Sequence, residues 1–243
     1  MLFKRYLCFL LFLLLSSSVF ASTMHLVTEE YAPLNYKAKY NGKIVGVCAD
    51  IVKELFRRAK INYTMELYPW EKAYDLALNN PDYAVFATAR TPEREKLFKW
   101  VGPLTQSQWI FLAKKSKHIS IRQLTEAKQY TIGAYQGDVV AEFLKLQGFK
   151  KLILSISDRP NIKKIMRDRI TLWATTQRHL QSLSKQQPIS KLEKVYDIHK
   201  TYLYIAFNKS TPDSIIQKLN AILNKMKKSG MVNLIDRFYK PIR

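Results

Sequence analysis

The sequence predicts an α/β fold built from two units of about 100 residues each. Short apolar segments, typical of strands, alternate with segments whose apolar residues recur every three or four positions, typical of amphipathic helices. The composition is that of a globular protein, because 47% of the 243 residues are hydrophobic and only 7 are Gly. No repeat or flexible linker separates the units, which favours a connection by strands.

The first unit alternates strands with helices that have recognisable start signals. Asp50 stands at an N-cap position before one helix, and Pro69 has the fixed φ that suits the start of the next. The strands of this unit are expected at residues 25–28, 43–47, 61–68 and 83–87.

The second unit repeats this alternation and is followed by a C-terminal helix. Strands are expected at residues 108–113, 130–135, 152–156, 171–174 and 201–207, and helices at residues 121–127, 139–147 and 161–169. The last helix has the clearest signals, because Thr211-Pro212-Asp213 combines a cap, a first-turn proline and an acidic first turn. Gly230 is expected to end it.

The N-terminus has the layout of a secretory signal peptide. Lys4 and Arg5 precede an apolar run at residues 7–15, and Val19-Phe20-Ala21 offers small residues at the positions that a signal peptidase reads. The apolar run is shorter than the ~20 residues that a membrane span needs. We therefore expect residues 1–21 to be a signal peptide cleaved after Ala21, so that the mature chain is exported.

Charge and cysteine content exclude several classes of function. The formal net charge of +21 comes from lysines and arginines that are spread along the chain, whereas a nucleic-acid binder concentrates them on one stripe. We therefore expect no nucleic-acid partner; contact with an anionic membrane surface stays open. After cleavage Cys48 is the sole cysteine, which excludes an internal disulfide and cysteine-rich metal sites.

Five motifs occur in an order that resembles a known family. They are residues 31–33 (Tyr-Ala-Pro), 46–51 (Gly-Val-Cys-Ala-Asp-Ile), 69–70 (Pro-Trp), 91–94 (Thr-Pro-Glu-Arg) and 132–137 (Ile-Gly-Ala-Tyr-Gln-Gly). Each motif alone is weak, but together they resemble the extracellular solute-binding protein family 3, the periplasmic amino-acid-type receptors of ABC importers. The resemblance covers essentially the whole mature chain.

The resemblance implies a two-lobed periplasmic binding protein of type II architecture, in which each lobe is a mixed sheet flanked by helices. Lobe 1 would comprise residues 22–104 and the return segment 202–243, and lobe 2 residues 105–201. The implied protein is a periplasmic monomer that closes on a small carboxylate-bearing ligand and delivers it to an ABC permease in the inner membrane. It needs no cofactor and no metal.

The resemblance also implies a set of ligand-binding residues. Arg94 matches the arginine that binds the ligand's carboxylate, for which a planar fork of donors is well suited. Tyr31 and Trp70 match the aromatic positions on either side of the ligand. The remaining candidates in the same cleft are Ala87, Ala89, Gly137, Asp138, Glu30, Thr176 and Arg90. Arg90 either adds a second cation to the cleft or faces solvent, and Asp138 is either a helix N-cap or an amine partner.

Three departures from the family pattern weaken the case for an amino acid, and two of them concern the ligand's amino group. The family usually has an acid near the end of the first strand, where this chain has Thr28, followed by Glu29 and Glu30. It usually has a second acid after a second-lobe strand, where this chain has Thr175 and Thr176. The hydroxyl residue usual before the Thr-Pro-Glu-Arg motif is Ala89. Because burying an ammonium group without a partner costs several kcal/mol, these departures argue against a standard amino acid in the standard pose.

Two other functions fit the same fold. A periplasmic dehydratase acting on prephenate-like acids would use a cationic cleft, here with Arg90 and Arg94. The sequence has no H-E-x-x-H or G-x-S-x-G motif, and its histidines are widely spread, so we expect no enzyme; His179 is the one to test first. A ligand receptor for a sensor would use the same lobes as a transport protein.

Overall fold

An eight-stranded mixed sheet runs through the molecule in the order β4-β1-β5-β10-β6-β9-β7-β8. The computed structural model describes residues 23–183 and 188–239, so the signal peptide predicted at residues 1–21 lies outside the described residues. The strands of the sheet are β1 (Met24–Thr28), β4 (Tyr63–Leu67), β5 (Tyr83–Ala89), β6 (Lys99–Lys114), β7 (Ile132–Tyr135), β8 (Leu152–Ser155), β9 (Leu172–Thr176) and β10 (Leu192–Phe207). A separate small sheet pairs β2 (Tyr36–Lys37) with β3 (Ile44–Val45).

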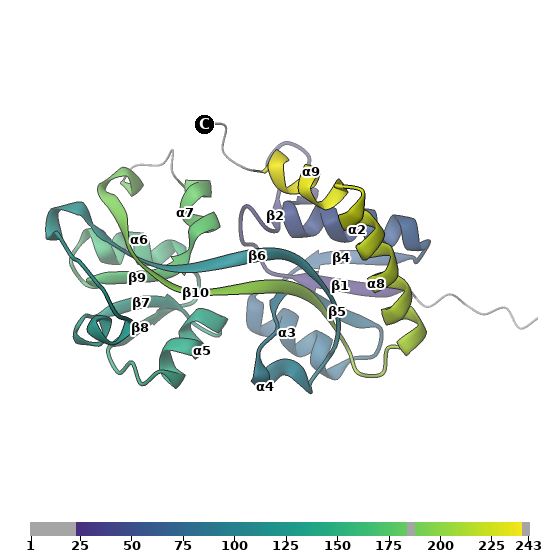
Figure 1. Ribbon diagram of the computed structural model, residues 1–243, viewed down its shortest axis with the longest axis horizontal. Coiled ribbons are helices and arrows are strands. Elements are labelled where there is room, and N and C mark those ends of the chain that lie inside the picture. The colour runs from purple at the N-terminus through teal and green to yellow at the C-terminus, as the bar shows by residue number, and fades with distance from the viewer. Residues whose placement is uncertain (1–22, 184–187, 240–243) are drawn as a thin grey trace, which may run out of the picture.

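The strands and helices form two lobes (Figure 1). In the first lobe, β1 is parallel to β4 and β5, and the helices are α2 (Val47–Ala59), α3 (Trp70–Asn79), α4 (Pro92–Glu95), α8 (Asp213–Lys228) and α9 (Met231–Phe238). In the second lobe, β7 is parallel to β8 and β9, and the helices are α5 (Val139–Leu146), α6 (Arg159–Met166) and α7 (Gln177–Leu183). The predicted two-lobed α/β architecture is therefore confirmed.

Short 3₁₀ helices complete the fold, at Lys115–Lys117, Leu124–Gln129 and Ile189–Lys191. The second of these replaces the α-helix expected at residues 121–127. The C-terminal helix ends near Gly230 as expected, but the chain then forms α9, which the sequence analysis did not anticipate. In the described part of the chain, no helix is long and apolar enough to cross a membrane.

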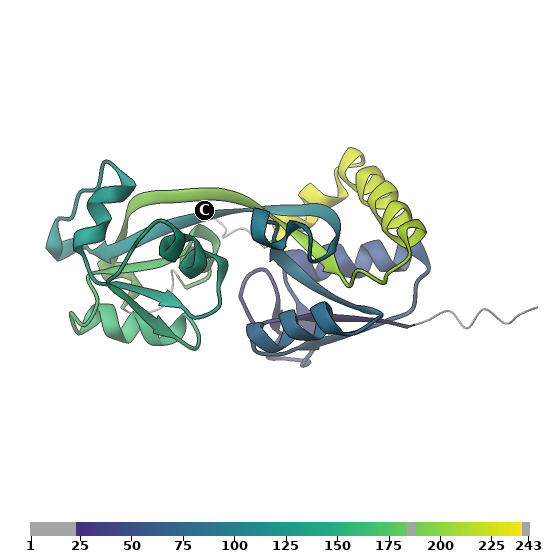
Figure 2. The ribbon, with the colours of Figure 1, turned by 90° about the horizontal axis from the view of Figure 1, so that it is seen from below.

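The lobes are joined by β6 and β10, each 16 residues long, which run side by side from one lobe to the other (Figures 1 and 2). The sequence predicted only their portions at residues 108–113 and 201–207. Gly102 and Pro103 lie within β6 although both residue types weaken strands, and the strand accommodates them where its register with β10 shifts. A Cβ at Gly102 would lie 2.3 Å from Cδ1 of Tyr204, so glycine is needed for this contact. The lobe boundaries near residues 104 and 201 stay a prediction.

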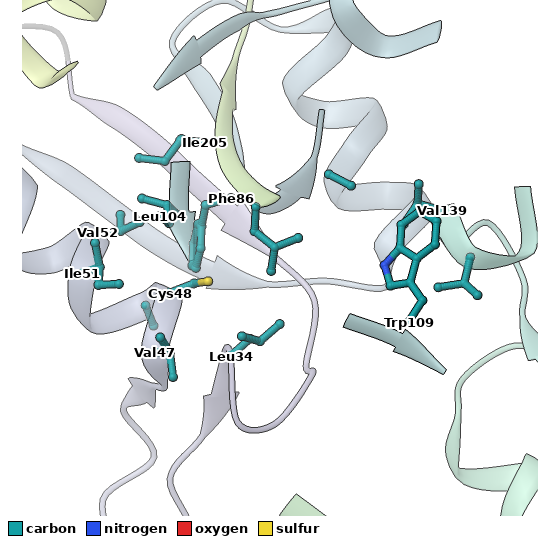
Figure 3. Close-up of a cluster of buried hydrophobic side chains, with 14 of the residues drawn as sticks. Leu34, Val47, Cys48, Ile51, Val52, Phe86, Leu104, Trp109, Val139 and Ile205 are labelled. Carbon is teal, nitrogen blue, oxygen red and sulfur yellow. The ribbon is translucent and has the colours of Figure 1, made fainter. Parts of the chain in front are cut away.

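The largest cluster of buried apolar side chains among the described residues extends from α2 across the sheet into the second lobe. Figure 3 shows Val47, Ile51 and Phe86 on the first-lobe side and Trp109 and Val139 at the other end. Burying one large apolar side chain, such as Ile51 or Phe86, stabilises the fold by about 1.5–3 kcal/mol. The same cluster continues into the second lobe through residues such as Ile132, Leu144 and Leu172, so one apolar core spans the region where the two lobes meet.

Helix α2 begins at Val47, so the expectation that Asp50 caps it is wrong. Gly46 occupies the N-cap position with φ 128°, and a Cβ there would lie 2.4 Å from the Leu34 carbonyl oxygen. The N–H groups of Val47 and Cys48 donate to the carbonyls of Pro33 and Leu34, both at 2.9 Å, in place of a side-chain cap. These bonds hold the turn that follows Tyr31 against α2.

Candidate functional site

Two cavities between the lobes are lined by predicted site residues, and we call them the inner cavity and the outer groove. The inner cavity has a volume of about 40 Å³, and its wall includes Glu29, Tyr31, Trp70, Arg94, Asp138 and Thr176. Several of these residues follow the carboxyl ends of the parallel strands β1, β7 and β9, the usual place of ligand sites in open α/β sheets. Ala87 and Ala89 of β5 also line the inner cavity.

Arg94 lies in the wall between the two cavities. It is only 5% exposed, and its guanidinium carbon lies 5.5 Å from the ring centroid of Trp70 and 5.2 Å from that of Tyr74. Its Nη2 donates to Oε2 of Glu142 on α5, at 2.7 Å, so that the ion pair joins the two lobes. The structure thus places Arg94 in the cleft, where its charge is matched by a carboxylate of the protein itself.

Tyr31 also connects the lobes, and it lines the same cavity as Trp70. Its hydroxyl donates to Oδ2 of Asp158 at 3.1 Å and lies 3.3 Å from the hydroxyl oxygens of Thr175 and Thr176. Its ring stacks on His179, with 4.6 Å between the centroids. Tyr31 is therefore anchored at its hydroxyl end, while Trp70 packs beside Arg94.

The family pattern places an acid at the position of Thr28, but the acid that lines the inner cavity here is the next residue, Glu29. Thr28 is buried, and its hydroxyl donates to the Phe86 carbonyl at 3.1 Å, so it supports packing of the sheet. The next residue, Glu29, lines the inner cavity, whereas Glu30 is exposed and lines neither cavity. Burial, reinforced by the neighbouring Asp138 carboxyl, raises the pKa of Glu29 to about 8.

Asp138 stands at the N-cap position of α5 and lines the inner cavity as well. Burial, followed by repulsion from the Asp158 carboxylate, raises the pKa of Asp138 to about 7, although Arg94 acts in the opposite direction. The cavity therefore holds two carboxyl groups whose negative charge is incompletely balanced. Such an environment favours a positively charged ligand group.

Asp158 is a buried acid that the sequence analysis did not single out. Trp173 Nε1 and Thr175 Oγ1 each donate to it at 2.8 Å, in addition to Tyr31. Its hydrogen bonds place it behind Thr175, next to the cavity rather than in its wall. The local pattern, an acid just before Arg159-Pro160 at the start of α6, signals only a helix start. Its proximity to Tyr31 depends on the tertiary fold.

The outer groove is much larger, about 1020 Å³, and it also receives residues from both lobes. It contains the predicted site residues Gly137 and Arg90. Arg90 donates to both carboxylate oxygens of Glu95, at 2.6 and 2.5 Å, and lies over the Trp100 and Tyr204 rings. Arg90 thus faces the groove rather than the inner cavity. Trp70, Arg94, Trp109 and Val139 line both cavities.

Ala87 has a backbone conformation that is unusual for its position. Its φ of 61° lies in the left-handed region, which a non-glycine residue within a strand seldom adopts. Such strain persists where the surrounding structure fixes it, and it is common at ligand sites. The bend lies where β5 reaches the inner cavity.

His179 lies close to Tyr31 and Asp158. Its Nε2 is 4.0 Å from Asp158 Oδ2, and its Nδ1 is 3.2 Å from the Ala32 carbonyl oxygen. Across residues 23–183 and 188–239, no three His, Cys, Asp or Glu side chains are grouped in a way that could hold a metal ion. His179 stacks against the Tyr31 ring and so helps to hold it in place.

Solved structures with the same architecture include several binding proteins. A histidine kinase sensor domain with similarity to periplasmic binding proteins has a TM-score of 0.82 at 13% identity, with 90% of this chain and 98% of that chain covered. An ancestral arginine-binding protein bound to arginine has a TM-score of 0.78 at 20% identity, covering 89% and 97%. The arginine-, lysine-, histidine-binding protein ArtJ from Geobacillus stearothermophilus has a TM-score of 0.77 at 18% identity, covering 90% and 97%.

Sequence comparison identifies the family. A search of curated protein sequences gave no match. The model of the family described as bacterial extracellular solute-binding proteins, family 3, matches residues 24–241, nearly the whole chain beyond the predicted signal peptide. With the cleft, the buried arginine and the two-lobed sheet, this match shows that the chain belongs to the bacterial extracellular solute-binding proteins, family 3.

Proposed function

We propose that this protein captures a small amino-acid-like solute, with a carboxylate and a positively charged amino group, between its two lobes. The observation that carries this proposal is the position of Arg94, buried beside the Trp70 ring on a wall of the cavity that also holds Glu29 and Asp138. The cavity offers a donor group for an anion and acceptor groups for a cation. Both ends of an amino acid therefore find partners.

Arg94 would bind the carboxylate by exchanging its partner. The lobes are closed on each other through contacts such as Tyr31 with Asp158 and Arg94 with Glu142. The Glu142 side chain is 46% exposed and therefore able to turn toward solvent. A guanidinium binds any carboxylate through the same planar fork of N–H donors, so a solute carboxylate would replace that of Glu142.

Glu29 and Asp138 would bind the amino group. The raised pKa values of about 8 and about 7 indicate that the cavity disfavours two negative charges. An ammonium group between these side chains would supply the missing positive charge, which a buried ammonium itself requires. This arrangement supplies the amine partners that the residues at Thr28 and Thr175-Thr176 do not provide.

Lobe closure would deliver the solute to an ABC permease in the inner membrane, from a monomeric protein in the periplasm. The similarity of this fold to the substrate binding protein of an amino acid ABC transporter supports this role. A ligand receptor for a sensor is the alternative, supported by the similarity to the histidine kinase sensor domain. We propose binding without turnover, in preference to the dehydratase alternative.

Isothermal titration calorimetry with the twenty amino acids, on wild-type protein and on Arg94→Ala, tests the proposed function. We expect at least one amino acid to bind and the variant to lose at least 100-fold in affinity, because a charged group loses its bidentate partner. Arg90→Ala is the matched control, since Arg90 pairs with Glu95 outside the inner cavity. Equal affinity of wild type and Arg94→Ala would overturn the proposal.

A further inference from the structure

The inner cavity is too small for most of a solute. Its volume of about 40 Å³ has room for roughly one to three water molecules, whereas ligand pockets usually measure about 300–1,000 Å³. The outer groove, at about 1020 Å³, reaches this size and adjoins the inner cavity. A further cavity of about 460 Å³, between α7 and α9, shares no lining residue with the inner cavity. When the lobes are closed, the bulk of a bound solute therefore belongs in the outer groove.

The two cavities share a wall, so one molecule can occupy both. Trp70, Arg94, Trp109 and Val139 line the inner cavity on one side and the outer groove on the other. A solute whose charged groups reach Arg94, Glu29 and Asp138 would direct its remaining atoms past these four side chains.

The outer groove offers mainly apolar contacts to those atoms. Tyr74 and Leu78 of α3 line it from the first lobe, and Phe143 of α5 lines it from the second. Two further leucines of its lining remain accessible to solvent in the closed structure, Leu97 at 39% and Leu146 at 67%. Large apolar side chains exposed around one groove are typical of a surface that a ligand covers.

The groove is lined from both lobes. Leu97 follows α4 in the first lobe, and Leu146 is the last residue of α5 in the second; in Figure 1, α5 lies opposite α3 and α4. An apolar group bound between these helices would contact both lobes and would therefore stabilise closure.

We propose that the outer groove is a subsite for an apolar tail, so that the solute is an amino-acid-like head joined to an aliphatic or aromatic group longer than the side chains of the small amino acids. This inference rests on the proposed function for the head group and adds the class of the tail. The head binds at the inner cavity, and the tail covers Leu97, Leu146 and Phe143.

A homologous series of L-2-aminoalkanoic acids, from three to ten carbons, tests this subsite because the head stays constant while the tail grows. Titration calorimetry on the full mature protein should show nearly constant affinity for the shortest members. Once the tail reaches the groove, affinity should rise by roughly fourfold for each methylene group, the increment expected for its burial.

The double variant Leu97→Ser/Leu146→Ser tests whether the groove causes this rise. It should weaken binding of the ten-carbon member at least fivefold while alanine binds as in the wild type, so that the rise with chain length becomes smaller. Leu234→Ser is the matched control, because Leu234 is 64% exposed on α9 and lines neither cavity. It should leave the whole series unchanged.

The outcomes separate the two proposals. If short members bind but affinity stays flat or falls as the tail grows, the apolar subsite is wrong and the proposed function stands. If affinity rises equally in the wild type and in the double variant, the tail lies elsewhere and the subsite is again wrong. If no member of the series and none of the twenty amino acids binds, the proposed function fails, and the subsite with it.

Discussion

Arg94 and Glu142 form an ion pair of 2.7 Å that joins the two lobes at the wall between the inner cavity and the outer groove. Arg94 is buried, whereas Glu142 reaches the pair from the more exposed side. The pair also occupies the guanidinium that the proposed solute needs. Glu142 and the solute's carboxylate are therefore expected to compete for Arg94.

Glu142→Gln should strengthen binding of an amino-acid solute by about tenfold, because a neutral amide competes less well than a carboxylate for the Arg94 guanidinium. The same change should lower the stability of the empty protein by roughly 1–2 kcal/mol, since Arg94 then lacks a charged partner. Titration calorimetry and urea unfolding measure the two effects. Glu95→Gln is the control, because Glu95 pairs with Arg90. Weaker or unchanged binding by Glu142→Gln would contradict the competition.

Asp138→Asn should reduce the pH dependence of stability. Because the pKa of Asp138 is raised from a usual 3.8 to about 7, its contribution to stability is complete below about pH 4 and is lost as the pH rises toward 7. Asparagine keeps the N-cap position but carries no charge. The variant should therefore gain on the order of 1–3 kcal/mol relative to wild type between pH 4 and pH 7.

Urea unfolding at pH 4, 5.5 and 7 measures this difference. Asp197→Asn serves as the control, because Asp197 is exposed on β10 and pairs with Lys194. If the stability difference between Asp138→Asn and wild type is the same at all three pH values, the pKa of Asp138 is not raised by its surroundings.

Glu29→Gln should change the proton balance of binding. With a pKa of about 8, the Glu29 carboxyl holds a proton in most empty molecules at pH 7, and an ammonium ligand favours its release. In the wild type, amino-acid affinity should therefore rise between pH 6 and pH 8, by up to about tenfold per pH unit for each of Glu29 and Asp138 that releases a proton.

Calorimetry in two buffers of different ionisation enthalpy measures the protons released. At pH 7 we expect between one and two protons in the wild type, since Asp138 also releases part of a proton, and about one fewer in Glu29→Gln. Glu30→Gln provides a neighbouring control, since Glu30 is exposed and lines neither cavity. The same proton release in all three proteins would rule out Glu29 as the amine partner.

Gly102→Ala should destabilise the connection between the lobes by about 1–3 kcal/mol, as overpacking does in a well-packed region. The added Cβ would lie 2.3 Å from the Tyr204 ring, at a residue whose φ is 157°. Gly230→Ala also places an alanine at a positive φ, of 76°, but its Cβ meets nothing within 4 Å, so it shows the cost of a positive φ without a close contact. Thermal unfolding compares them; equal losses would mean that the Tyr204 contact contributes little.

The fold could be predicted largely from local patterns, because its strands and helices follow the apolar periodicity of segments such as residues 83–87 and 139–147. The long strands β6 and β10 could not, since Gly102-Pro103 resembles a strand end and only the pairing with β10 carries the strand past it. Helix α9 was missed because Gly230, which ends one helix, also begins the next.

The candidate site was predictable where a motif marks the residue, as at Arg94, Trp70 and Asp138, which all line the inner cavity. Glu29 required the structure, because the sequence does not tell which of residues 28–30 faces the cleft at the end of β1. Asp158 and Glu142 meet Tyr31 and Arg94 across 127 and 48 positions of sequence, so their roles depend on how the lobes come together.

A crystal structure of the protein purified without denaturation, with its co-purified solute or a bound amino acid, tests the central claim most directly. We predict a carboxylate within hydrogen-bonding distance of the Arg94 guanidinium, an amino group beside Glu29 and Asp138, and the Glu142 side chain turned away. A solute bound elsewhere, with Arg94 and Glu142 still paired, would contradict the account.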